Sequence, residues 1–99
     1  MKILILDGKI QTNSSLIYDF FAKEFDFGPY FRRNPDALYD FMIPIDDEDR
    51  PLIIEWNNYN VFKEKNPTDF EIFLSVFDRI SDFEKNDKTI FELKLLGND

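Results

Sequence analysis

The sequence contains no cysteine and no histidine among its 99 residues, and it has only three glycines. Without cysteine there is neither a disulfide framework nor a thiol nucleophile. Without histidine the chain lacks the commonest general base, the usual metal ligand and the side chain that titrates near neutral pH. The glycines are too scattered to form a phosphate-binding loop. We therefore expect a protein that is not an enzyme and carries no cofactor.

Basic residues are also scarce, because 12 lysines and arginines stand against 20 aspartates and glutamates, for a net charge of −8. Such a surface repels nucleic-acid phosphates and anionic lipids, so we predict no direct nucleic-acid partner and no membrane partner. A basic protein would be attracted instead, at a rate that falls as salt rises. Acidity that merely keeps the protein soluble explains the same count.

Long hydrophobic runs are absent as well. The N-terminal apolar run spans only residues 3–6 before Asp7, which is too short for a signal peptide or a membrane span. We therefore expect a cytoplasmic protein. The hydrophobic fraction of 43% includes 12 phenylalanines, enough for one compact core. The length predicts a single domain over residues 1–99.

Three short apolar runs predict strands at residues 2–6, 52–56 and 88–96. The first two lack a clean polar alternation, which indicates a sheet covered over most of its surface. Strands joined by helical crossovers are parallel, and such crossovers are right-handed. The sequence therefore predicts an α/β fold of order βααβααβ, with a three-stranded parallel sheet packed with helices.

Helical spacing of apolar residues predicts the intervening helices. The first runs from Ser14 to about Glu24, with its core positions at Leu16, Ile17, Phe20, Phe21 and Phe25, and Gly28-Pro29 stops it. In the second helix, Asn34 is the N-cap, Pro35 is the first residue and Pro44 marks the end. A short third helix lies within 57–65. The fourth follows Asn66-Pro67 and reaches roughly Lys85, with core positions at Phe70, Phe73, Leu74, Phe77 and Ile80.

The second helix carries an unusual outward face. Asp36 and Asp40 lie four residues apart on one side, with Tyr39 beside them, while Leu38 faces the core. The preceding loop adds the aromatic side chain of Tyr30. Exposed aromatic rings beside carboxylates are typical of a protein interface. A purely structural explanation also fits, in which Asp36 favours the helix N-terminus and Tyr30 covers the edge of the core.

Three segments of the sequence resemble the barstar family of ribonuclease inhibitors. Residues 34–40 (NPDALYD) resemble the N-L-D-A-L-W-D helix of that family, and residues 51–56 (PLIIEW) resemble its P-L-V-L-E-W strand. Residues 71–77 (EIFLSVF) are similar to its E-x-V-L-x-V-F helix. The opening strand and first helix follow in register, so the similarity runs from about Met1 to Leu96.

The resemblance implies a single barstar-like domain that inhibits by mimicry, with a helix carboxylate in the place of the RNA phosphate. By position, Asp40 would be that carboxylate, Asp36 would flank it, and Tyr30 would pack on the catalytic histidine of the enzyme. An enzyme site that binds phosphate through arginine forks accepts a carboxylate in the same way. The resemblance also implies that Tyr39 would line the contact and that Glu71 would add a peripheral charge pair. The predicted partner-binding set includes Phe31, Arg32 and Asn34 as well, because they belong to the loop and the helix start beside these residues.

The sequence departs from the family pattern near this helix. Arg32 stands where the family has glycine, and Arg33 stands where it has an acid. Either the cognate enzyme has an acidic rim there, or these arginines pair with Asp36 or with the acidic loop at residues 46–49. Tyr39 replaces the family's tryptophan, and Ile45 stands at a second aromatic position. Both changes reduce the aromatic part of the interface.

The first hypothesis is therefore a protein inhibitor of a barnase-type microbial ribonuclease, acting in self-protection or in immunity to a toxin. The alternative is a barstar-like binding module for a basic toxin domain that is not such a ribonuclease. A third hypothesis, a metal-dependent hydrolase, would need a cation at Asp46 or Asp47. The run at 46–49 lacks the spaced oxygen ligands and the turn glycine of a calcium loop, which favours a solvated loop.

Overall fold

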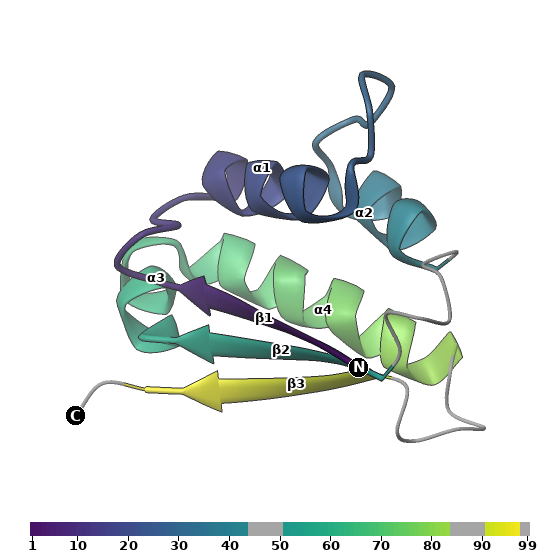
Figure 1. The fold of residues 1–99 in the computed structure, drawn as a ribbon. Helices are drawn as coiled ribbons and strands as arrows, with labels where there is room; N and C mark the ends of the chain where they lie inside the picture. The colour runs from purple at the N-terminus through teal and green to yellow at the C-terminus, as the bar shows by residue number, and fades with distance from the viewer. Residues whose placement is uncertain (44–50, 84–90, 98–99) are drawn as a thin grey trace.

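The computed structural model describes residues 1–43, 51–83 and 91–97. Its strands form one parallel sheet in the order β1-β2-β3 (Figure 1). The α/β fold of order βααβααβ is confirmed. Within the described ranges the elements are β1 (Lys2–Asp7), α1 (Ser14–Phe25), α2 (Pro35–Met42), β2 (Leu52–Asn57), α3 (Tyr59–Lys65), α4 (Pro67–Phe83) and β3 (Phe91–Leu96).

Asparagine side chains begin the first two helices. The Oδ1 atom of Asn13 accepts a hydrogen bond from the backbone N–H of Leu16 at 3.0 Å, and so caps α1. Asn34 caps α2 in the same way, as predicted, with Pro35 as the first helical residue. The end of α1 at Phe25 lies within one residue of the prediction, but Asp26, in the left-handed region at φ 51°, ends the helix before Gly28-Pro29 is reached. The predicted ends at Pro44 and Lys85 lie outside the described residues.

The helices all lie on one side of the sheet. Both crossovers move one strand in the same direction, and a right-handed crossover then places its helices on the same face (Figure 1). Leu4 and Leu6 are buried on that face, whereas Ile3 and Ile5 on the other face are 48% and 53% exposed. The expectation of a mostly covered sheet is therefore wrong. A short apolar run does not reveal whether its alternate residues face helices or water.

Trp56 lies at the centre of the core and is fully buried. Its ring centroid lies 5.3–6.3 Å from those of four phenylalanines from α3 and α4, namely Phe62, Phe70, Phe73 and Phe77. The predicted core stripe of α4 is confirmed at Phe70, Phe73, Phe77 and Ile80. Leu74 is only half-buried, and Val76, which the stripe omitted, is buried.

The core stripe of α1 is rotated from its predicted position. Leu16 is 40% exposed, while Tyr18 is buried in its place. The ring of Tyr18 lies 5.1 Å from that of Phe73 and 6.3 Å from that of Phe31. This side of α1 therefore faces α4 and the loop before α2, which are partners that the spacing within α1 does not identify. Phe20 and Phe25 are partly buried against the core, and Ile17 and Phe21 are fully buried.

The turn after β1 packs tightly on the start of α3. A Cβ atom at Gly8 would lie 2.1 Å from the carbonyl oxygen of Asn58, so only glycine fits there. The Asn58 amide donates to Asp7 Oδ1 at 2.9 Å, and the Lys9 backbone N–H donates to the same oxygen. These two hydrogen bonds, that of Asn58 first, lower the pKa of Asp7.

Candidate partner-binding face

The face in question is the outward side of α2, defined by Asp36, Tyr39 and Asp40. The orientation of α2 is fixed by the opposite side of the helix, where Leu38 and Met42 are buried in the core. Asp36 and Asp40 are exposed and Tyr39 is half-buried. The structure therefore brings these three predicted residues together on one surface. Asn34 lies at the start of the helix, where its side chain caps it.

An arginine of α4 crosses the N-terminal end of this face. The Nη1 atom of Arg79 donates to Asp36 Oδ1 at 3.2 Å. The guanidinium carbon lies 4.3 Å from the ring centroid of Tyr39, within the range of a cation–π contact. The Asp36 side chain is 86% exposed and that of Arg79 is 48% exposed, so both groups remain accessible. Arg79 was absent from the predicted set.

Asp40 differs from Asp36 in that it has no partner among the described residues. Within residues 1–43, 51–83 and 91–97, no hydrogen bond or ion pair is formed by its carboxylate. It lies four residues after Asp36, about 6 Å further along the helix axis. An exposed carboxylate without an internal cation is free to accept the cation of a partner.

The loop before α2 is held by an aromatic cluster formed by Phe27, Phe31 and Phe41. The ring centroids of these residues are 5.0–5.3 Å apart in each pair. Phe31 is therefore half-buried and supports the loop, whereas Tyr30 beside it is 88% exposed. The purely structural explanation, in which Tyr30 covers the core edge, is wrong. The cluster presents Tyr30 to solvent on a supported loop.

The two arginines that depart from the family pattern behave differently. Arg33 forms an ion pair with Asp19 of α1. It therefore pairs with an acid, as one alternative held, but with an acid other than Asp36. Arg32 is exposed and forms no ion pair with a described residue. Its position leaves the acidic-rim alternative open, and the acidic loop at 46–49 lies outside the described residues, as does Ile45.

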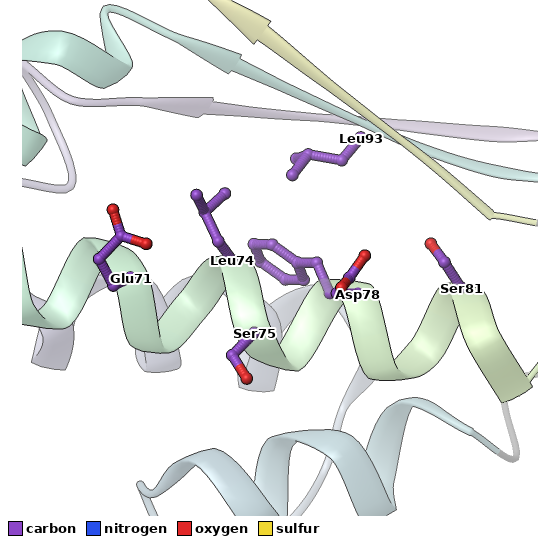
Figure 2. Close-up of a pocket in the computed structure, with 7 residues that line it drawn as sticks. Glu71, Leu74, Ser75, Asp78, Ser81 and Leu93 are labelled. Atoms are coloured by element: carbon purple, nitrogen blue, oxygen red, sulfur yellow. The ribbon is translucent and has the colours of Figure 1, made fainter.

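Glu71 lies apart from the α2 face. It is exposed and lines a groove of about 470 Å³ between α4 and β3 (Figure 2). No residue of α2 lines that groove, whose other lining residues are Leu74, Ser75, Phe77, Asp78, Ser81 and Leu93.

The described ranges also bear on metal binding and on membrane spanning. They contain no group of three His, Cys, Asp or Glu side chains placed to hold a metal ion. Asp46 and Asp47, which the hydrolase hypothesis invoked, lie outside these ranges. No described helix combines the length and the apolar character that crossing a membrane requires.

Local sequence gives no signal for Arg79, because its partner Asp36 is 43 residues away in the chain. Asp19 was missed for the same reason, since its partner Arg33 belongs to another element. Phe27 had a weak signal, as a third phenylalanine close to Phe25 and Phe31 in a short loop.

Comparison with known proteins places this face in a family context. The family described as Barstar (barnase inhibitor) matches residues 1–95. This range includes α2, α4 and the loop before α2 that carries Tyr30 and Phe31, called the aromatic loop below. No curated protein matches the sequence.

Proposed function

The chain belongs to the barstar family, and from this membership we propose that it inhibits a barnase-type microbial ribonuclease. Members of that family are inhibitors of a ribonuclease and bind it as a protein partner. The proposed mechanism is occlusion of the enzyme's active site by the α2 face and the aromatic loop. The observation that carries this proposal is Asp40, an exposed carboxylate on α2 with no cation of its own among the described residues.

Asp40 takes the role of the RNA phosphate in this mechanism. A ribonuclease site binds phosphate through cationic donors, and a carboxylate on a rigid helix offers two oxygens to the same donors. The helix is fixed by its Asn34 cap and by the burial of Leu38 and Met42. Little ordering is therefore needed on binding, which favours affinity.

Tyr30 supplies contact area beside the charge. Its ring is 88% exposed on a loop that Phe27, Phe31 and Phe41 support from below. A rigid aromatic side chain offers a large contact surface at a small cost in conformational entropy. In the proposed complex Tyr30 packs on the catalytic histidine of the enzyme, and Arg32 lies beside it at the rim.

The net charge of −8 supports the same kind of partner. A basic extracellular-type ribonuclease or toxin domain would be steered toward an acidic protein, most strongly at low salt. We infer that the protein acts in the cytoplasm, in self-protection or as the immunity partner of a toxin, and that it has no activity as an enzyme.

A second candidate function is supported by the arginines around the face. Arg32 stands in the loop directly before α2 and Arg79 contacts Asp36, so a uniformly basic target would be repelled at this end of the face. This arrangement suits a basic toxin domain that is not a barnase-type ribonuclease. A neighbouring gene that encodes a small basic protein without a ribonuclease site would favour this second function.

The test is a titration of RNA cleavage by a barnase-type ribonuclease with this protein, at low and at high salt. The proposal predicts inhibition at a 1:1 ratio, with an association rate that falls as salt increases. The absence of inhibition at a large excess of the protein would contradict the first function. Binding to another basic toxin domain would then support the second.

A further inference from the structure

The acidic face of α2 contains a cation that belongs to the chain itself. We propose that Arg79 is a specificity-determining residue of this face, because it occupies the place beside Asp36 and Tyr39 that a partner's cation would otherwise take. The partner's cation is then accepted at Asp40 in preference to Asp36, and a carboxylate or neutral acceptor of the partner faces Arg79. That this face binds a partner at all rests on the proposed function.

Two contacts hold Arg79 in this place. Its guanidinium donates to Asp36 at 3.2 Å and lies 4.3 Å from the centre of the Tyr39 ring. An ion pair on an exposed carboxylate is weak by itself. The aromatic ring beneath the guanidinium adds a second attraction and restricts its orientation. A second guanidinium that approached Asp36 would be repelled by the positive charge of Arg79, and it could stack on the ring face that Arg79 covers only by displacing it.

Because about half of its side chain is exposed, Arg79 can also contact a partner directly, besides occupying the place beside Asp36 and Tyr39. A guanidinium has five N–H donors, and among the described residues Asp36 accepts from one of them. Because 48% of the side chain is exposed, donors remain available to a carboxylate approaching from outside. The planar arrangement of those donors suits a carboxylate, which can accept two of them at once.

The charges on this face therefore alternate along α2. Asp40 is open and negative, and the positive Arg79 contacts Asp36, which lies about one helical turn before Asp40. This separation is shorter than the Debye length in physiological salt, so a partner senses both charges. The matching partner surface carries a cation and an acidic or neutral acceptor about 6 Å apart, rather than cations throughout.

The first experiment needs no partner protein. We would titrate 15N-labelled protein with ethylguanidinium, a small mimic of an arginine side chain, and follow the amide shifts of α2. In the wild type, Asp40 should respond while Asp36 and Tyr39 respond at least threefold less. In Arg79→Gln, the responses of Asp36 and Tyr39 should rise to that of Asp40.

The matched control is Arg33→Gln, which removes another arginine that is paired with an acid but lies off the Arg79 contact. This control should leave the wild-type pattern unchanged. Equal responses of Asp36 and Asp40 in the wild type would overturn the proposal. So would a wild type in which Asp40 does not respond.

The second experiment uses a catalytically inactivated barnase-type ribonuclease as the probe. Arg79→Glu should change the Kd by at least tenfold, and Arg33→Gln by less than twofold. A change under twofold for Arg79→Glu, with strong wild-type binding, would overturn the role of Arg79 and leave the proposed function intact. If the wild type does not bind the probe, the proposed function fails, and the titration with ethylguanidinium still decides the role of Arg79.

Discussion

Asp36 and Asp40 are the same residue type on the same side of the same helix, one turn apart. Asp36 forms an ion pair with Arg79, and its neighbour Tyr39 lies beneath the same guanidinium. Asp40 pairs with no described residue. The two carboxylates are the same residue type in one helix, and among the described residues only Asp36 receives an arginine of α4.

The comparison of Asp36 with Asp40 shows that packing between helices decides which surface charges remain unpaired. The 20 acidic residues make the net charge negative. The carboxylates most available to a cation of a partner are those that form no ion pair within the chain. We infer that Asp40, in the second turn of α2, receives the partner's cation, while Asp36, in the first turn, holds Arg79 on the face.

The largest effect is expected at Asp40. Replacement by alanine removes the open carboxylate and should weaken binding to the ribonuclease by about 2 kcal/mol or more, a loss typical of a hot-spot residue. The barnase–barstar pair is itself a reference case for such hot spots, so this magnitude rests on that case. Isothermal titration calorimetry measures the loss. The free energy of unfolding should change by less than about 0.5 kcal/mol, because the side chain is exposed.

A second comparison concerns two aromatic residues of the loop, the exposed Tyr30 and Phe27 of the supporting cluster. Tyr30→Ala should weaken binding by about 1–2 kcal/mol without changing stability, because the ring is 88% exposed. Phe27→Ala is the matched variant from the supporting cluster, and it should lower the free energy of unfolding by about 1–3 kcal/mol. Urea unfolding and a binding titration on both variants separate the two roles. Equal stability losses would contradict the exposed position of Tyr30.

The first turn of α2 is tested through its cap. Asn34→Ala removes the acceptor of the Ala37 N–H and should lower the free energy of unfolding by about 1 kcal/mol. Asn13→Ala removes the equivalent cap of α1 and should cost a similar amount. Only Asn34→Ala should also weaken binding, because only that cap orders the α2 face. A loss of binding in both variants would indicate a general effect of destabilisation.

The smallest effect concerns Asp7, a carboxylate that serves the fold alone. Hydrogen bonds from Asn58 and from the Lys9 backbone lower the pKa of Asp7 below its ordinary value of 3.8. Folding therefore favours the charged form, and this stabilisation is present above pH 3.8 and lost as pH falls through the lowered pKa. Urea unfolding at pH 6 and pH 3 should show a smaller loss of stability in Asp7→Asn than in the wild type. An equal loss would mean that Asp7 does not contribute.

The fold was largely predictable from the sequence because its signals are local. The Asn34-Pro35 pair predicted the start of α2, and the apolar spacing in α4 identified four of its buried residues. The exposed face of the sheet was not predictable in this way. Ile3 and Ile5 look the same in a strand that is covered on one side as in one covered on both.

The candidate face was predictable only in part, for the same physical reason. Periodicity along α2 placed Asp36, Tyr39 and Asp40 on one side, since all three belong to one helix. The contact of Arg79 with Asp36 spans 43 residues and depends on how α4 packs against α2. Arg33 likewise pairs with Asp19 of α1, although Asp36 is nearer in the sequence.

The most direct test of the account compares the two carboxylates in one experiment. The Kd values of the wild type, Asp36→Asn and Asp40→Asn are measured against the same ribonuclease, at the same salt concentration. Asparagine keeps the shape of aspartate and removes its charge. The replacement should therefore weaken binding mainly at Asp40, whose carboxylate pairs with no described residue. The account predicts that Asp40→Asn raises the Kd at least tenfold more than Asp36→Asn does. Equal losses in the two variants, or a larger loss in Asp36→Asn, would contradict it.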